Sequence, residues 1–387
     1  MPYAAAAALV FLAARSAGLW MYLLSSPSSL GPQTLAALLR HALDLSLVAV
    51  ALAGAASAGR RALRAAGALP NDPAWFGWVC GLVAGEAAWS LSVWLLVAGG
   101  LCQPLPCAAL WLFLAAAAWR DRRELARLVP PAARGTLAIA ACAVTLACLL
   151  LGAIAAGAPP TDWDTLVYHF ALPKLYLAQG GFHRLPWSVS AHFPLNAEML
   201  YAWALALRGD EAAQWLSWLH GPLLLVVAAA WASGGRSSTV GWVTAALLAA
   251  TPAFCRVLGT GKNDLQTALA VTATIGAALE ARRRQNARAW LLAGLMAGAA
   301  ASTKLTGLWG AAAAALLALA AKRRRGEALL WFAAGAAVLG LPWYARNWLW
   351  TGDPFWPLLG RWLGDADAAV VYTRLRAADT GGLPRTL

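Results

Sequence analysis

The chain repeats long apolar runs that are separated by short polar connections. A run of about 20 apolar residues crosses a bilayer as an α-helix, because the hydrocarbon core is about 30 Å thick and a helix rises about 1.5 Å per residue. Of the 387 residues, 61% are hydrophobic and 12% are charged, whereas a soluble domain carries about 25% charged residues. The sequence therefore predicts an all-α fold, a polytopic transmembrane helical bundle.

The apolar runs predict about 11 spans. They lie at 4–24, 35–58, 75–98, 105–119, 136–158, 212–232, 238–256, 265–281, 288–303, 305–321 and 327–343. The stretch 159–211, between the fifth and sixth spans, is too polar to cross a bilayer. Its parts 165–180 and 196–207 are typical of amphipathic interfacial helices that lie on a membrane surface. On this interpretation Glu198 is a surface charge of the second helix.

Basic residues are concentrated in alternate connections between the expected spans. These connections lie at 59–64, 120–134, 236, 282–288 and 322–325. Basic connections face the cytoplasm in membrane proteins. We therefore expect a cytoplasmic amino terminus and 159–211 on the outer side. The alanine- and arginine-rich composition is typical of a GC-rich bacterial genome, so we expect a bacterial inner membrane protein whose outer side is periplasmic. The formal net charge of +13 then reflects orientation in the membrane, and no nucleic-acid partner is expected.

Polar residues that are far apart in the sequence all fall on the predicted outer side. Carboxylates at the end of a span are unfavourable unless they are solvated, paired or bound to a metal. Their gathering on one side predicts a single external site. The candidate site residues are Asp162, Asp164, Tyr168, His169, Lys174, Lys262, Asp264, Lys304, Arg346 and Asn347.

Four motifs, in this order, resemble those of the GT-C glycosyltransferases. The closest likeness is to bacterial protein-mannosyltransferase and aminoarabinose-transferase members, which are similar to glycosyltransferase family 39. The motifs are Asp164-Thr-Leu-Val-Tyr-His169 with Pro173-Lys174, Lys262-Asn-Asp264, Ser302-Thr-Lys304-Leu-Thr-Gly307, and Pro342-Trp-Tyr-Ala-Arg346-Asn347 with Thr351-Gly-Asp-Pro354. Each lies on the predicted outer side.

The resemblance implies a division of the chain into three parts. A GT-C-like core of seven helices covers 135–357 and includes the external loop 159–211. Four extra helices in 1–134 precede it, and a short periplasmic tail, 358–387, follows. The family carries further helices or a soluble domain after its core, so we expect either a reduced acceptor-binding part or a shortened sequence.

The resemblance also implies the reaction. A sugar would pass from a polyprenyl-phosphate donor to an acceptor on the outer face, with inversion at the anomeric carbon. Asp164 is the expected base, with Asp162 and Asp264 as further catalytic carboxylates. The departing phosphate would meet substrate-binding residues, namely Tyr168, His169, Lys174, Lys262, Lys304, Arg346 and Asn347. Asp164 and Asp264 are also candidate ligands of a divalent metal, Mg²⁺ or Mn²⁺, and no other cofactor is expected. The sequence indicates membrane lipids as partners but neither the sugar nor the acceptor.

Each assignment has a structural alternative. Asp164 and Asp264 each precede a helix and can act as N-caps, and Asp162 can be a solvated loop charge. Lys304 can be an interfacial anchor, and Arg346 can pair with Asp353. The spacing of three histidines in the long loop matches no standard metal-ligand pattern. They are His169, His183 and His192.

Four charges fall within or near the early spans, where charge is unfavourable. They are Arg15, Arg40, Asp44 and Glu86. The simplest expectation is that Arg15 or Arg40 pairs with Asp44 across the first two helices. The Gly81–Gly85 and Gly294–Gly298 spacings favour close helix packing.

Two other classes of function compete with the enzyme. A transporter or flippase of lipid-linked saccharides would use the same charged external site without catalysis. It should, however, place polar groups near the middle of the bilayer. A purely structural subunit would not explain why polar motifs gather on one side. The sequence therefore favours a membrane glycosyltransferase.

Overall fold

A computed structural model describes residues 32–69, 74–128, 130–185, 188–234, 237–321, 324–363 and 373. The expected span 4–24, Arg15 and most of the tail after 358 lie outside the described residues. Every element in the described part is helical, so the all-α prediction is confirmed.

The long helices follow the apolar runs, because hydropathy sets their limits, but those over the expected spans 35–58, 105–119 and 327–343 run six to eight residues further. Five of them are long and apolar enough to cross a membrane, namely α2, α3, α5, α8 and α14, and the chain is a multi-pass membrane protein. The longer elements are α2 (Pro32–Ala65), α3 (Ala74–Ala98), α4 (Pro104–Leu125), α5 (Thr136–Ala156), α8 (Asp210–Ser233), α9 (Ser238–Ala249), α10 (Pro252–Val257), α11 (Asp264–Arg284), α12 (Trp290–Thr303), α13 (Gly307–Leu319) and α14 (Arg325–Thr351).

The expected span 238–256 is two helices rather than one. α9 ends at Ala249, and α10 begins at Pro252. Proline lacks an N–H and suits the first position of a helix, and Thr251 caps the new helix by accepting a hydrogen bond from the Phe254 N–H at 3.4 Å.

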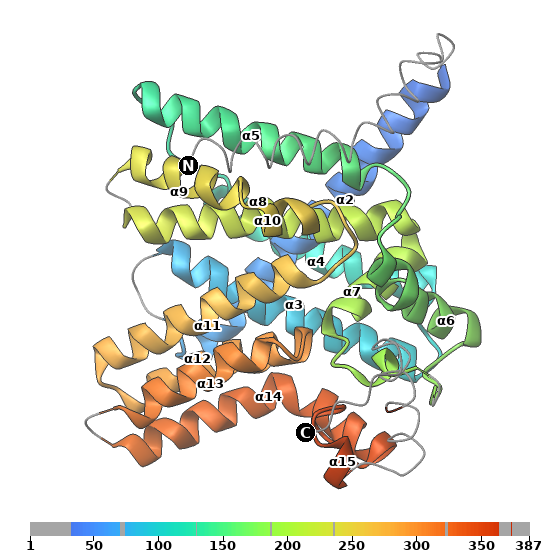
Figure 1. Cartoon of the computed structure of the whole chain (residues 1–387), viewed down its shortest axis with the longest axis vertical. Coiled ribbons are helices and arrows are strands. Elements are labelled where there is room, and N and C mark those ends of the chain that lie inside the picture. Colours follow the sequence, from blue (N-terminus) through green and yellow to red (C-terminus); the bar gives the residue numbers. More distant parts are fainter. Residues whose placement is uncertain are drawn as a thin grey trace.

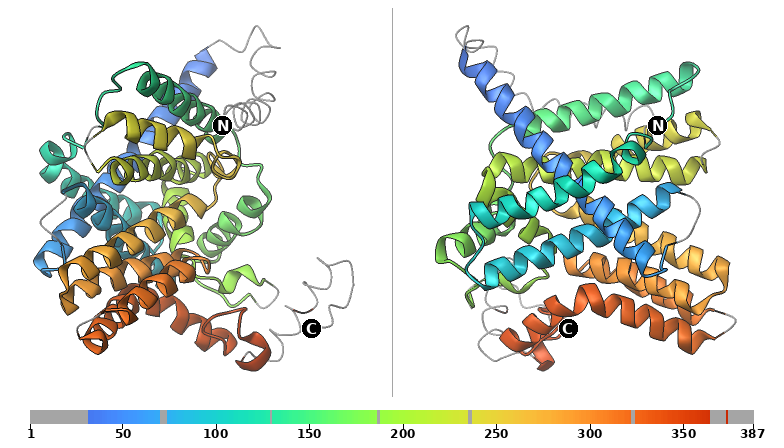
Figure 2. Two further views of the ribbon diagram at one scale, coloured as in Figure 1. Left: turned by 60° about the vertical axis from the view of Figure 1, so that its left-hand side comes forward. Right: turned by 180° about the vertical axis from the view of Figure 1, so that it is seen from behind.

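Short helices gather at one end of the bundle (Figure 1). They include η2 (Thr165–His169), α6 (Ala171–Gln179), η3 (Ser190–His192), α7 (Asn196–Leu207) and α15 (Gly360–Leu363). Figure 1 shows α6, α7 and α15 at the right-hand end, and the C-terminal ends of α11 and α13 at the left-hand end. From behind, in Figure 2 (right), the end with α6 lies on the left. We call the end with α6, α7 and α15 the site end. We call the end with the C-terminal ends of α11 and α13 the arginine-rich end.

The helix α7 is not the surface helix that the sequence predicted. Its residues from Asn196 to Ala204 are all buried, and it packs against α3, α4, α6, α8 and α12. The physical reason is that, apart from Asn196 and Glu198 near its start, α7 has apolar residues on every side, and such a helix is buried rather than laid on a surface. The Trp203 indole N–H donates to the Cys107 carbonyl at 3.0 Å, which anchors α7 to α4.

The early helices are joined to the core by polar contacts. Arg208, which follows α7, lies 2.6 Å from Asp44 of α2. Among the described residues Asp44 therefore pairs with Arg208 of the long loop rather than with Arg40, whereas the expected pairing with Arg15 lies outside the described residues. Ser90 of α3 donates to the Asn196 carbonyl at 2.7 Å.

Close helix packing at the two glycine pairs is confirmed. A Cβ on Gly85 would collide with the backbone of Ala55 in α2, and one on Gly298 would collide with the backbone of Ala336 in α14. Only glycine therefore fits where these helices cross.

Candidate active site

The turn after α5 presents Asp164 without using it as a helix cap. Asp162 Oδ1 accepts hydrogen bonds from the backbone N–H of Asp164 at 3.1 Å and of Thr165 at 3.3 Å. The side chain of Asp164 makes no capping bond, so the capping alternative for Asp164 is wrong. Asp162 takes that role and leaves the Asp164 carboxylate available.

Lys262 joins this turn to the connection between α10 and α11. Its Nζ lies 2.8 Å from Asp164 Oδ2 and 3.3 Å from Asp162 Oδ1. The Lys262 carbonyl accepts hydrogen bonds from the Tyr201 hydroxyl at 3.1 Å and the Ser217 hydroxyl at 2.7 Å. Two motifs separated by about a hundred residues therefore meet, as predicted, and α7 and α8 hold one of them from behind.

The Asp164–Lys262 pair is ionised. Burial acts to raise the pKa of Asp164, but the hydrogen bond and charge of Lys262, with the charges of His169 and Lys304, bring that pKa below its usual value. Burial acts to lower the pKa of Lys262, and its hydrogen bond to Asp164 and the charges of both carboxylates raise that pKa instead. Asp164 is therefore a carboxylate at neutral pH and able to accept a proton as a base.

A second ion pair lies at the start of α11. Lys304, which follows α12, places its Nζ 2.8 Å from Asp264 Oδ1. Asn263, rather than Asp264, occupies the N-cap position of α11, so the capping alternative for Asp264 is wrong. The charge of Lys304 also contributes to the low pKa of Asp164.

A buried carboxylate, Glu198, lies beneath these pairs. Its side chain is 1% exposed, and its Oε1 lies 2.6 Å from Nδ1 of the fully buried His169. Asn263 Nδ2 donates to the same oxygen at 3.2 Å. The prediction that Glu198 is a surface charge is therefore wrong. No local signal indicated the burial, because a lone carboxylate is buried only when it is partnered, and its partners here come from other segments of the chain.

Tyr168 and His169 lie on η2, one turn of π-helix. The turn is closed by a 2.9 Å hydrogen bond from the Phe170 N–H to the Thr165 carbonyl, and such wide turns recur at functional sites. The two neighbouring rings lie 4.0 Å apart between centroids, and the Tyr168 ring also meets Phe193 edge to face. Both predicted residues therefore lie on the turn that directly follows Asp164, and the charge of His169 contributes to the low pKa of Asp164.

Arg346 and Asn347 form a separate set of donors near the end of α14. Arg346 is 5% exposed; its Nη2 donates to the Phe193 carbonyl at 2.5 Å and to Asn347 Oδ1 at 2.9 Å. Asp353 instead accepts from the backbone N–H groups of Phe355 and Leu359, so the predicted alternative of an Arg346–Asp353 ion pair is wrong. Nη1 of Arg346 and Nδ2 of Asn347 are buried without a hydrogen-bond partner among the described residues.

Lys174 and two of the loop histidines have partners outside the Asp164–Lys262 and Asp264–Lys304 pairs. Lys174 Nζ lies 2.8 Å from Asp210 at the start of α8, so its charge is already matched. His183 faces the Gln179 carbonyl at 3.3 Å. Burial, with the charges of Arg346 and Arg184, lowers the pKa of His192 to about 4, and His192 is therefore neutral at physiological pH.

A second buried network lies within the bundle and links α3 to the core. Glu86 Oε1 lies 2.8 Å from His220 Nε2, and Glu86 Oε2 accepts from Gln266 Nε2 at 3.1 Å. His220 Nδ1 faces the Leu216 carbonyl at 2.9 Å. Both ring nitrogens of His220 thus face acceptors.

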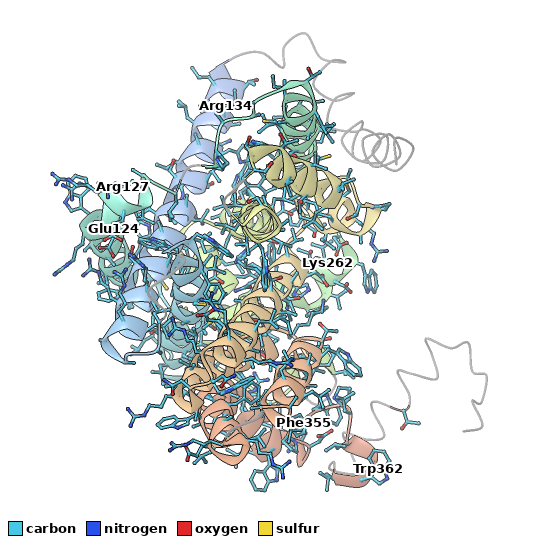
Figure 3. All side chains as sticks on the ribbon, turned by 90° about the vertical axis from the view of Figure 1, so that its left-hand side faces the viewer. Glu124, Arg127, Arg134, Lys262, Phe355 and Trp362 are labelled. Atoms are coloured by element: carbon cyan, nitrogen blue, oxygen red, sulfur yellow. The ribbon has the colours of Figure 1, made fainter. Side chains whose placement is uncertain are left out.

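Figure 3 views the bundle from its arginine-rich end, turned by 90° from Figure 1. Glu124, Arg127 and Arg134 lie at the left of that view, and Lys262 lies at the right. The Arg60–Glu124 pair, 2.6 Å long, holds α2 against α4.

Residues 194–350 match the family model of the dolichyl-phosphate-mannose-protein mannosyltransferases. No curated protein and no solved structure matches the chain. The matched residues include Lys262, Asp264, Lys304, Arg346 and Asn347, and they begin after the turn that carries Asp164. The match confirms the predicted resemblance over this part of the chain, and it supports a membrane glycosyltransferase of the GT-C type.

Proposed function

We propose that this protein transfers a sugar from a polyprenyl-phosphate donor to an acceptor on the outer face of the bacterial inner membrane. The observation that carries the proposal is the Asp164–Lys262 pair, which joins two distant connections at one end of the bundle. The family similarity over 194–350 provides the reaction class. The arginine-rich opposite end supports a cytoplasmic amino terminus and an outward-facing site.

In the proposed reaction, Asp164 accepts the proton from an acceptor hydroxyl or amine. The freed electron pair forms a bond to the anomeric carbon, while the bond from that carbon to the phosphate oxygen breaks. The lipid phosphate leaves with the bonding electrons, and attack from the opposite side inverts the anomeric centre. Asp162 and Asp264 hold Lys262 and Lys304 in place beside the base.

The leaving phosphate needs positive charge and hydrogen-bond donors. Lys262 and Lys304 are each partnered with a carboxylate, whereas Arg346 has no carboxylate partner in the described part of the chain. A buried guanidinium without an anion is unfavourable. We therefore assign the main phosphate contact to Arg346, assisted by Asn347, with Lys262 and Lys304 as supporting cations and with Tyr168 and His169 beside the sugar.

A divalent metal does not fit the described donors well. Asp164 and Asp264, the two expected ligands, each face a lysine ammonium at 2.8 Å. In the ranges that the structure covers, no group of three or more His, Cys, Asp or Glu is arranged to hold a metal ion. No step of the proposed reaction therefore uses a metal, and the assay below decides between this and the Mg²⁺ or Mn²⁺ that the sequence led us to expect.

The test is a transfer assay on the full chain in nanodiscs with a panel of radiolabelled polyprenyl-phosphate sugars. Wild type should release or transfer sugar from at least one donor, and Asp164→Asn should be slower by about 10²–10⁴-fold because the base is lost. The matched control is Asp210→Asn, which removes another carboxylate paired with a lysine at the same end. Equal activity of Asp164→Asn and wild type would remove Asp164 as the base.

The same assay also tests the metal. Because the carboxylates already have ammonium partners, transfer should be unchanged when Mg²⁺ is replaced by EDTA. A loss of activity that Mg²⁺ or Mn²⁺ restores would show that one of these metals is needed.

A transporter or flippase is the second candidate, and one observation favours it. The Glu86–His220–Gln266 network lies between helices, and transporters place polar groups within the bilayer. Movement of a lipid-linked saccharide across wild-type proteoliposomes, without any transfer product, would favour this candidate over the enzyme.

A further inference from the structure

Glu198 bonds one residue from each of the two segments that form the Asp164–Lys262 pair. His169 belongs to the segment 162–169, and Asn263 belongs to the segment 262–264. Glu198 Oε1 lies 2.6 Å from His169 Nδ1 and 3.2 Å from Asn263 Nδ2. The ion pair and the Glu198 bonds are therefore two separate connections between the same segments.

The two connections differ in their surroundings. The Asp164 side chain is 43% exposed, so solvent screens its attraction to Lys262 and an exposed pair holds two segments only weakly. Glu198, His169 and Asn263 are all buried, where hydrogen bonds are stronger than in water and the loss of a partner is unfavourable. The buried bonds are therefore better able than the ion pair to set the distance between the segments.

The rest of the hydrogen bonding supports this role. Asn263 Nδ2 also donates to the Thr303 carbonyl at 3.0 Å, and Asn196 Nδ2 donates to the Thr303 hydroxyl at 3.2 Å. Thr303 directly precedes Lys304, so the same network reaches the second ion pair. The network thus lies below segment 162–169, segment 262–264 and Lys304, which together carry the paired charges of the site.

We propose that Glu198 is a positioning residue for the proposed transfer reaction. It holds segments 162–169 and 262–264 at the separation at which Lys262 meets Asp164, and it does so from below, without contacting the reacting atoms. The activity arm of its test rests on the proposed function, whereas the structural arm does not.

The structural arm measures amide hydrogen exchange of the full chain in nanodiscs. In Glu198→Ala, the amides of 162–170 and 258–266 should exchange about tenfold faster, while those of α5 and α9 should be unchanged. Glu198→Gln keeps an acceptor oxygen and should stay near wild type. Asp121→Ala, which removes a buried carboxylate at the arginine-rich end, should leave both segments protected. Unchanged exchange of both segments in Glu198→Ala would overturn the proposal.

The activity arm separates positioning from general stability. Glu198→Ala should lower kcat by up to about 100-fold, because a misplacement of about 1 Å is enough for such a loss, with little change in KM for the donor. In an Asp164→Asn background the same substitution should have almost no further effect. An equal loss in both backgrounds would mean that Glu198 does not act through Asp164.

The outcomes of the two arms are distinguishable. If wild type transfers no sugar from any donor, the proposed function fails, and the exchange measurement still decides whether Glu198 couples the segments. If wild type is active but exchange is unchanged in Glu198→Ala, the positioning proposal fails alone.

Discussion

The two ends of the bundle use charge in different ways. At the arginine-rich end, Arg283 and Arg284 pair with Glu280, and Arg324 pairs with Glu327, each within one helical turn. At the site end, Asp164 pairs with Lys262 and Asp264 pairs with Lys304. Those partners come from different helix connections. Charges that set orientation in the membrane need no distant partner, whereas a reaction needs groups that the fold brings together.

The difference is not absolute, because two pairs at the arginine-rich end also join separate helices. Arg60 pairs with Glu124, and Arg61 pairs with Asp121. Both pairs connect the ends of the same two helices, α2 and α4, and so hold one helix contact. The site end instead combines the connection after α5 with those before α11 and after α12.

The largest difference between the ends should appear in two arginine substitutions. Arg346→Ala should lower the rate of sugar transfer by about 10²–10³-fold, because it removes the buried donor assigned to the leaving phosphate. Arg284→Ala should leave transfer near wild type, because its partner Glu280 still has Arg283 beside it. Initial rates with saturating and limiting donor check both. An Arg346→Ala enzyme with wild-type kcat/KM would place the phosphate elsewhere.

A smaller effect should appear in the pH dependence of transfer. The proposed base must be ionised, and its folded pKa is lower than the ordinary aspartate value of 3.8. The rate of sugar transfer should therefore be at its maximum at neutral pH and fall only as the pH decreases through that low pKa.

Lys262→Gln provides the comparison for that pH profile. It removes the main group that lowers the pKa of Asp164, while burial still acts to raise it. The acid limb of kcat/KM should therefore move to higher pH, and Arg324→Gln at the other end should not move it. A Lys262→Gln profile that overlays wild type would show that another group controls the limb.

The smallest effect should be the change in protein stability when ion pairs at the arginine-rich end are removed. Glu280→Ala removes two exposed ion pairs within one helix, each of which contributes about 0.3–0.5 kcal/mol. The apparent melting temperature of the protein in nanodiscs should therefore change little. A large fall would show that this end also holds a tertiary contact, and the contrast between the ends would be lost.

Much of the fold could be predicted because hydropathy is a local property. The limits of α3, α5 and α8 lie within a few residues of the expected spans, since twenty apolar residues form a helix in a membrane whatever their neighbours are. The helix α7 could not be placed in the same way, because burial on all sides depends on α3, α4 and α8 packing around it. An apolar helix with one carboxylate has the same local pattern on a surface or in a core.

Part of the candidate site was predictable for a different reason. Successive spans alternate in direction, so the side of the membrane follows from counting them, and Asp164, Lys262, Asp264 and Lys304 could be assigned to one end. The partners could not be assigned, and Asp162, not Asp164, takes the capping role. A capping bond depends on the orientation of one side chain, which spacing does not determine.

By itself, the sequence determined the helical class, the positions of most spans and the end of the bundle at which the polar motifs lie, because these depend on local composition and on alternation. Only the tertiary structure decided that Lys262 meets Asp164, that Lys304 meets Asp264, and that Glu198 is buried below them. Those contacts join residues far apart in the chain. Their distances are set by how the helices pack, which no single stretch of sequence contains.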